Sequence, residues 1–449
     1  MLYRKIQPFL ENYLRSDSNK ILIVDGARQV GKSFIIRHVG NKLFENYIEL
    51  NFVEDKNGPG LFENVRTVND FYFQVSTTAG DKMGTKQNTL IFLDEIQAYP
   101  HLLTLLKFLK QDDRYTYIAS GSLLGVTLRK TSSIPIGSIE FKRMYPLDFE
   151  EFLLANGFNQ YAIEAMRGKY TGGESLDESA HRRVLDLFKK YLLIGGMPDA
   201  VKTFISEPNI VKIRAIHNDI RAFYADDASK YEEDYNKKLK IRKIYEMIPS
   251  NMENKKKRVF FQDIEEKKGK RFSDYQDEFE YLISAGIALD VNAVSTPVFP
   301  VTQSAGKNLL KLYMNDVGLL TSVLYGSNIR AVLDDEAGIN LGSVYESVVA
   351  QELAAHDNKL FYYDNRSKGE VDYLIDDYES LSTVPIEVKS GKDYTIHSAL
   401  TAFVSNEDYH VKKAYVLSNE REIKRKGKII YLPIYYIMFF QNSPVDMQF

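Results

Sequence analysis

The segment Gly26–Ser33 reads GARQVGKS and directly follows the apolar run ILIVD at Ile21–Asp25. Its pattern, G-x-x-x-x-G-K-[ST], places backbone N–H groups around an anion when it joins a strand to a helix. The run before it is typical of a buried strand, and SFIIRHVGNKLF after it is typical of an amphipathic helix. We therefore predict an α/β domain in which this loop and the positive end of the following helix bind phosphate.

Each residue of the loop has its own expected role in binding a nucleotide. Gly26 and Gly31 can adopt backbone angles closed to other residues. Lys32 can reach the β- and γ-phosphates, and the Ser33 hydroxyl can bind Mg²⁺. The cofactors expected are therefore ATP and Mg²⁺. The candidate nucleotide-binding residues in the loop are Gly26, Ala27, Arg28, Gln29, Val30, Gly31, Lys32 and Ser33.

A second strand, in TLIFLDEIQAYP at 89–100, ends in the acidic pair Asp94 and Glu95. Buried parallel strands deliver such side chains to the carboxyl edge of a sheet, where a phosphate loop also lies. We expect Asp94 to hold the magnesium shell and Glu95 to activate the attacking water. A further strand, YTYIAS, leads into GSLLG, and either Ser120 or Ser122 could hydrogen-bond the water or the γ-phosphate; an ordinary strand-ending turn is the alternative.

The motifs GARQVGKS, IFLDEIQ, IASGSLL and MYPLDFEEF occur in this order. In this they resemble the AAA-type P-loop ATPases of a large prokaryotic family. The resemblance implies a five-stranded αβα sandwich over residues 1–155, with the strand of Asp94 beside the phosphate-loop strand. It also implies that the family's C-terminal domain, which is uncharacterised, belongs to the restriction-endonuclease-like, or PD-(D/E)xK, superfamily.

The same resemblance implies an arginine that reaches the γ-phosphate, supplied by this chain or by a neighbouring subunit, so self-association stays open. Arg129 and Arg143 are the candidates, with an ordinary surface role as the alternative for each. Many relatives carry a Gly-Arg pair just before the strand that ends near Arg143, whereas this chain has Gly137 and Ser138.

The middle of the chain is predicted to hold two modules. From the resemblance, which includes YLLIGGMPDAV at 191–201, residues 156–250 are expected to form a helical lid or connector. Residues 251–330 read as helices followed by two strands, IALDVNAV and NLLKLYMND, which is the order of a winged helix. Four consecutive basic residues could contact DNA phosphates there, or could form a solvated face; they are Lys255, Lys256, Lys257 and Arg258.

The last segment, 335–449, carries acidic residues on a helix and on two strands. In IEVKS the period of two places Glu387 and Lys389 on one face, away from the apolar residues between them. Glu346 lies on the preceding amphipathic helix and Asp372 on the preceding strand. We expect Glu346, Asp372 and Glu387 to hold Mg²⁺ or Mn²⁺, with Lys389 orienting the water or the phosphate. The family resemblance agrees at all four positions.

Bulk composition narrows the remaining choices. The chain of 449 residues is long enough for several domains, and its net charge of −3 excludes a globally basic nucleic-acid binder. It has no cysteine, no run of 18 apolar residues and no signal-peptide pattern at its start, which fits a cytoplasmic protein without a membrane partner. The seven histidines are scattered, so a histidine-based metal site is not expected.

The leading functional hypothesis is an ATP-hydrolysing P-loop protein coupled to a nuclease-like C-terminal domain that acts on nucleic acid. A second hypothesis is a nucleotide-gated binding or scaffold protein whose nuclease fold is catalytically inactive. A third is a DNA-binding regulator that acts through the winged helix.

Overall fold

The computed structural model divides into two compact units. Unit 1 comprises residues 3–145 and 280–287, and unit 2 comprises residues 146–279 and 288–449, while Met1 groups with unit 1 and Leu2 with unit 2. The residues that the structure describes are 1–122, 124, 136–230, 234–254, 256–334, 339, 341–365, 368–391 and 393–441.

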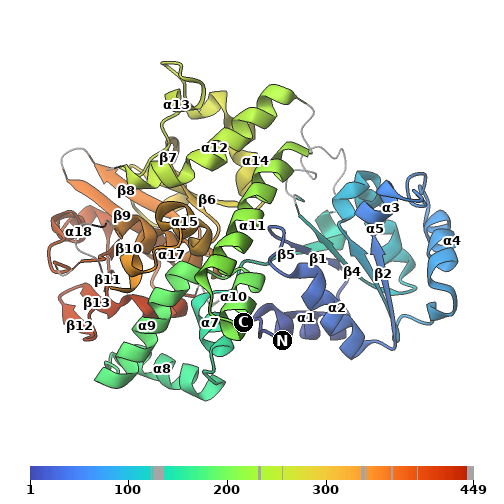
Figure 1. Ribbon diagram of the computed structural model, residues 1–449, viewed down its shortest axis with the longest axis horizontal. Helices are drawn as coiled ribbons and strands as arrows, with labels where there is room; N and C mark the ends of the chain where they lie inside the picture. The colour runs from blue at the N-terminus through green and yellow to red at the C-terminus, as the bar shows by residue number, and fades with distance from the viewer. Residues whose placement is uncertain are drawn as a thin grey trace. The chain divides into compact units, whose positions relative to one another are not determined.

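Unit 1 is a five-stranded parallel sheet with helices on both faces (Figure 1). The strand order is β2-β3-β4-β1-β5. The strands are β1 (Ile21–Asp25), β2 (Asn46–Asn51), β3 (Thr89–Asp94), β4 (Thr116–Gly121) and β5 (Ile139–Arg143). The main helices are α1 (Ile6–Arg15), α2 (Lys32–Leu43), α3 (Phe52–Asn57), α4 (Val68–Ala79) and α5 (Pro100–Asp112).

Successive side chains of each strand point to opposite faces of this sheet, and helices cover both faces. Ile21 and Ile23 share one apolar core with side chains of α4 and α5. Helix α2 lies on the opposite face, where a Cβ at Gly40 would contact the side chains of Tyr47 and Leu90. Because both faces are covered, the three central strands β1, β3 and β4 are almost entirely buried, whereas the edge strands β2 and β5 carry polar residues.

The prediction that the strand of Asp94 lies beside the phosphate-loop strand is wrong. Strand β4 pairs with β1 on one side and with β3 on the other, so β3 does not touch β1. Two strand spacings of about 4.8 Å therefore separate β1 from the strand that carries Asp94. Asp94 nevertheless reaches the loop, because the Ser33 hydroxyl, at the start of α2, donates to both of its carboxylate oxygens at 3.0 Å.

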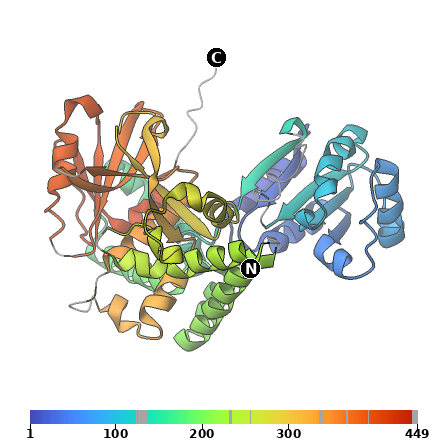
Figure 2. The ribbon, with the colours of Figure 1, turned by 90° about the horizontal axis from the view of Figure 1, so that it is seen from above.

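Unit 2 contains an eight-stranded mixed sheet in the order β12-β13-β11-β10-β9-β8-β6-β7. The segments that form it are coloured from yellow to red in Figure 2. Its strands are β6 (Ala288–Val294), β7 (Ala305–Met314), β8 (Phe361–Asn365), β9 (Gly369–Asp377), β10 (Ser382–Val388), β11 (Ala414–Ser418), β12 (Lys424–Lys426) and β13 (Ile429–Pro433). Strands β8 to β10 are antiparallel neighbours, and β11 continues the sheet parallel to β10.

The two strands expected as the wing of a separate module belong to this same sheet. Strand β6 pairs with β7 and also, in parallel, with β8 of the C-terminal segment. The β6–β7 hairpin is therefore not the ribbon of a separate winged helix over 251–330, as predicted. An apolar hairpin next to an unpaired sheet edge gains backbone hydrogen bonds when it joins that sheet.

Helices surround the sheet within unit 2. Helices α9 and α11 pack on α15, which in turn packs on α17, so the segment expected as a lid contacts the C-terminal half of the chain. The longer helices are α8 (Gln160–Gly172), α9 (Glu178–Ile194), α10 (Pro198–Ser206), α11 (Ile210–Lys230), α12 (Tyr235–Glu253), α15 (Val317–Tyr325) and α17 (Gly342–Ala355), and α14 (Gln276–Ser284) runs from unit 2 into unit 1. Shorter ones are α7 (Phe149–Ala155), α13 (Gln262–Glu265), α16 (Arg330–Leu333) and α18 (Ser398–Val404).

The glycine pair of the YLLIGGMPDAV motif allows a buried carboxylate to approach the backbone. Asp316 caps α15 by accepting from Leu319 N at 3.1 Å, and it also accepts from Gly196 N at 2.6 Å. Burial raises the pKa of Asp316 to about 6. A side chain at Gly195 would collide with this carboxylate, and a Cβ at Gly196 would lie 2.0 Å from the Leu147 carbonyl oxygen.

This crowding predicts a large effect of one methyl group. Gly196→Ala should lower the free energy of unfolding by more than about 2 kcal/mol, because neither the Leu147 backbone nor the cap can move without losing hydrogen bonds. Gly168→Ala, where the added Cβ meets no atom within 4 Å, should instead stabilise helix α8 by about 1 kcal/mol. Denaturant unfolding of both variants checks the pair; equal effects would refute the packing argument.

Candidate active site

The phosphate loop of unit 1 has the backbone strain that its glycines were expected to absorb. Gly26 has φ +147°, and a Cβ there would lie 2.2 Å from the Met144 carbonyl oxygen. Gly31 has φ +97° and precedes the first turn of α2. Gln29 also lies in the left-handed region, at φ +63°. A buried arginine near the chain start, Arg4, donates to the Val30 carbonyl at 2.8 Å and so supports the loop from outside the motif.

Lys32 lies inside the loop rather than in solvent. It is 5% exposed, and its ammonium donates to the carbonyls of Gly26 at 3.0 Å and Ala27 at 2.8 Å. Burial lowers the pKa of Lys32, although nearby carboxylates, led by that of Glu95, oppose the shift. A buried ammonium so placed gains from any additional negative charge, which is what the phosphates of a nucleotide supply.

Asp94 accepts hydrogen bonds from two serine hydroxyls, Ser33 and Ser120. Burial, the Glu95 charge and Glu49 raise the pKa of Asp94, while the serine hydrogen bonds oppose this. A cation would relieve the cost of this buried charge. Because a hydroxyl and a carboxylate lie side by side here, Ser33 and Asp94 fit the Mg²⁺ that an ATPase of this type uses.

Glu95 lies immediately after β3 with φ +52°, a strained conformation for a side chain other than glycine. Its carboxylate accepts from the Gln97 amide and, at 3.1 Å, from the Ser122 hydroxyl. Arg28 of the phosphate loop donates to the same hydroxyl at 3.0 Å. The two candidate serines therefore have separate partners: Ser120 supports Asp94, and Ser122 joins Glu95 to the loop.

The arginine candidates have different outcomes. Arg143 forms an ion pair with Asp25 at 2.6 Å and donates to the carbonyls of Ile283 and Ser284. Held in this way within unit 1, Arg143 is a structural residue in this conformation. Arg129 lies outside the described residues.

The C-terminal candidates of unit 2 lie close to one another. The Asp372 carboxylate accepts from Val388 N at 2.8 Å, and Glu387 pairs with Lys389 at 2.7 Å. Burial, followed by the neighbouring carboxylates of Glu387 and Glu346, raises the pKa of Asp372 well above its ordinary value. Burial also raises the pKa of Glu387, although Lys389 opposes the shift.

Glu346 is already neutralised by residues of this chain. It forms an ion pair with Lys257 and accepts from Tyr313 at 3.2 Å, while the ammonium of Lys311 lies 3.8 Å away. Lys311 is fully buried in β7 and pairs with Glu370 at 2.5 Å. Burial would lower the pKa of Lys311, but the surrounding carboxylates, led by Glu346, raise it above its ordinary value.

This arrangement bears on the expected C-terminal metal residues. Within the described residues, no three histidine, cysteine, aspartate or glutamate side chains are grouped to hold a metal ion, so the set of Glu346, Asp372 and Glu387 stays a prediction. A lysine ammonium stands beside Glu346 and another beside Glu387.

Two of the four basic residues expected to contact DNA phosphates form ion pairs within unit 2. Lys257 is used by Glu346, and Arg258 pairs with Asp364 at 2.5 Å with its side chain 11% exposed. Lys256 is exposed, and Lys255 lies outside the described residues. These two basic residues pair with acids that are distant in the sequence, Glu346 on α17 and Asp364 on β8, so a local count of charges does not reveal the pairs.

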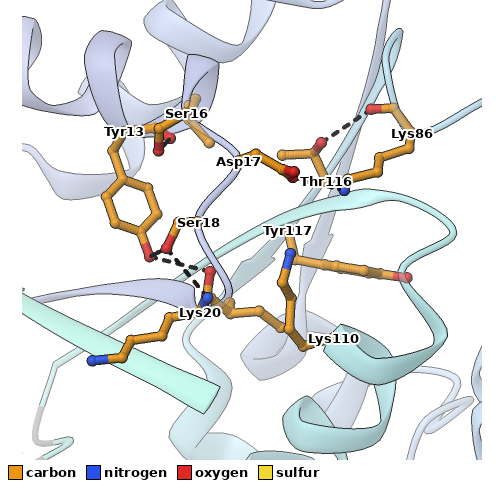
Figure 3. Close-up of a pocket in the computed structure, with 11 residues that line it drawn as sticks. Tyr13, Ser16, Asp17, Ser18, Lys20, Lys86, Lys110, Thr116 and Tyr117 are labelled. Carbon is orange, nitrogen blue, oxygen red and sulfur yellow. Dashed lines mark hydrogen bonds and ion pairs between the residues drawn. The ribbon is translucent and has the colours of Figure 1, made fainter. Parts of the chain in front are cut away.

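A pocket of unit 1 lies at the opposite edge of the sheet, where β1 and β4 begin (Figure 3). Two of its three lysines have acidic partners: Lys86 pairs with Asp17 at 3.1 Å and with Asp113 at 2.7 Å, and Lys110 also pairs with Asp113. The pocket is therefore not a strong anion site.

None of the helices in the described part of the chain has the length and apolar character required to cross a membrane.

Comparison with known families agrees with the geometry of the loop and its acids. Residues 18–153 match the AAA domain family. The chain therefore contains an AAA-type P-loop ATPase domain, for which nucleotide binding and hydrolysis are expected. Residues 185–330 match a domain of unknown function, DUF8612, and residues 341–437 match another, DUF4143.

Individual relatives are distant. An uncharacterized protein of Methanocaldococcus jannaschii, MJ1544, is 22% identical over 363 residues, which span 80% of this chain and 72% of the relative. The Walker-type ATPase PABY2304 of Pyrococcus abyssi aligns with a TM-score of 0.42 and 13% identity, over 72% of this chain and 96% of that one. AMPPCP-bound DnaA from Aquifex aeolicus aligns with a TM-score of 0.30 and 10% identity, over 63% and 89%.

Two adjacent lysines test the ion pairs of unit 2. Lys257→Ala should lower the free energy of unfolding by about 1–3 kcal/mol, because it leaves the buried Glu346 carboxylate without its closest cation. Lys256→Ala, at an exposed position, should change it by less than about 0.5 kcal/mol. Denaturant titrations monitored by tyrosine fluorescence give both values. Equal effects of the two substitutions would show that the Glu346 pair is unimportant.

Proposed function

We propose that this protein binds ATP with Mg²⁺ in the phosphate loop of unit 1 and hydrolyses it, with Glu95 as the base. The observation that carries the proposal is the position of the Glu95 carboxylate. It follows directly after Asp94, lies near the buried Lys32 ammonium, and is held by Gln97 and Ser122. Mg²⁺ would supply charge neutralisation for the β- and γ-phosphates, and Ser33 and Asp94 are the residues that would hold it.

The protein's own groups perform the remaining steps. The loop N–H groups and Lys32 bind the phosphates and fix the γ-phosphorus. Glu95 accepts a proton from the attacking water, whose oxygen forms the new bond to the γ-phosphorus. The bond between that phosphorus and the bridging oxygen then breaks, and its electron pair leaves with ADP.

The Glu95 role predicts a separation of binding from turnover. Glu95→Gln should retain ATP affinity while lowering kcat by about two to four decades, the usual contribution of a general base. Lys32→Ala should instead abolish binding, because its ammonium is the cation that the loop directs at the phosphates. Titration with a fluorescent ATP analogue and a phosphate-release assay check the two variants. Normal turnover by Glu95→Gln would assign the base elsewhere.

For unit 2 we propose a binding role within a nuclease-like fold, with hydrolysis of ATP controlling what it binds. The pairing of Lys257 with Glu346 and of Lys389 with Glu387 supports this choice, because ammonium groups provide the charge that a metal would otherwise supply. A metal-dependent nuclease using Asp372, Glu387 and Lys389 is the second candidate, favoured by the closeness of the two carboxylates. Nucleic acid as the partner and a cytoplasmic location remain predictions.

Thermal unfolding of the full chain distinguishes the two roles of unit 2. At pH 8, Asp372→Asn should raise the melting temperature, because it removes a buried charge that its surroundings disfavour. Millimolar Mn²⁺ should then shift the wild type and the variant equally, through the nucleotide site alone. A larger shift in the wild type, together with Mn²⁺-dependent cleavage of DNA or RNA that the variant lacks, would establish the nuclease instead.

A further inference from the structure

Arg28, the third residue of the phosphate loop, places a guanidinium beside the proposed base. Its Nε donates to the Ser122 hydroxyl at 3.0 Å, and that hydroxyl donates to the Glu95 carboxylate at 3.1 Å. Ser122 is 2% exposed, whereas Arg28 is half-buried. A single buried hydroxyl therefore separates the guanidinium from the group that would accept the proton of the attacking water.

The same guanidinium belongs to a loop that already holds a second cation. The Lys32 ammonium donates at 2.8 Å to the carbonyl of Ala27, the residue directly before Arg28. Burial lowers the pKa of Lys32, and the charge of Arg28 adds to that shift. Like charges repel, and an arginine cannot lose its proton to relieve the cost. An anion that binds both cations would remove it.

The γ-phosphate of ATP is the anion that this position fits. Lys32 is the residue that reaches the β- and γ-phosphates, and the attacking water lies between the γ-phosphorus and the base. Arg28 is close to both, because it shares the loop with Lys32 and is tied to Glu95 through Ser122. The hydrogen bond from Nε fixes the plane of the guanidinium, whose terminal nitrogens carry the remaining N–H donors. Arg143, by contrast, is paired with Asp25.

We propose that Arg28 is a catalytic residue of ATP hydrolysis: its terminal nitrogens donate to the γ-phosphate oxygens and stabilise the transition state from within the same chain. The proposal rests on the proposed hydrolysis of ATP at this loop. The guanidinium forms no covalent bond and transfers no proton; it neutralises charge on the γ-phosphate while the bond from phosphorus to the bridging oxygen breaks. An arginine that only held Ser122 in place would bind the transition state and the product equally.

The first experiment compares turnover with the binding of ADP by the full-length protein. Arg28→Ala should lower kcat by about three decades, the lower end of what such an arginine contributes. Its affinity for ADP should stay within about threefold of the wild-type value, because ADP has no γ-phosphate. With Mg²⁺ and aluminium fluoride, which mimic the group in transfer, ADP should bind the wild type more tightly than ADP alone, and Arg28→Ala should lose this gain.

Arg15→Ala is the matched control, because Arg15 is exposed at the end of α1 in the same unit. It should change none of these values. An unchanged kcat of Arg28→Ala, or an undiminished gain with aluminium fluoride, would overturn the proposal.

The second experiment separates a missing guanidinium from a disturbed loop. Low millimolar guanidinium chloride should raise the turnover of Arg28→Ala by about tenfold or more and leave that of the wild type unchanged. Ser122→Ala removes the tether to Glu95 but keeps the guanidinium, so it should lower kcat less than Arg28→Ala does. Absence of rescue, or a loss in Ser122→Ala as large as in Arg28→Ala, would show that Arg28 only positions the base.

The variant of the base distinguishes this proposal from the function on which it rests. If Glu95→Gln lowers turnover while Arg28→Ala does not, the assignment of Arg28 is wrong and the proposed function stands. If the wild type does not hydrolyse ATP, the proposed function fails, and the role of Arg28 fails with it.

Discussion

The buried ammonium of Lys32 is the constraint around which unit 1 is arranged. An ammonium removed from water must be compensated by nearby oxygen atoms, and here two loop carbonyls and several carboxylates provide them. Of the two acids that follow β3, Asp94 is buried and Glu95 is half-buried, and serine hydroxyls and an amide hydrogen-bond them. The buried ammonium of the loop is stabilised by negative charge, and the acids are stabilised by positive charge. A nucleotide bound with Mg²⁺ supplies both, through its phosphates and through the metal ion.

The sheet topology and the site depend on each other through β4. Its insertion between β1 and β3 moves Asp94 away from the phosphate-loop strand, yet it brings Ser120 and Ser122 alongside the acidic pair. Each serine then has its own acid, and the Arg28 contact ties the second of them to the loop. The strand that separates the motifs in space is therefore also the strand that connects them chemically.

Sequence patterns were sufficient for features that depend on neighbouring residues. The loop, the strand ending in Asp94 and Glu95, and the helix that carries Glu346 are local, and their residues lie where the patterns indicate. Strand order, the pairing of β6 with β8 and the partner of Lys257 depend on segments far apart in the chain. Composition and spacing carry no information about such pairs. Lys311 was a missed signal: a lysine inside the apolar strand NLLKLYM needs a buried acid.

The pairing of Lys257 with Glu346 has a consequence for how relatives of this protein can diverge. Neither residue can change alone without leaving a buried charge uncompensated, so the two positions should vary together across homologues. A relative that keeps the acid but has a small residue at the lysine position would offer an open carboxylate to a cation. The identity of this one basic residue would therefore decide whether the Glu346 carboxylate is paired within the chain or open to a cation.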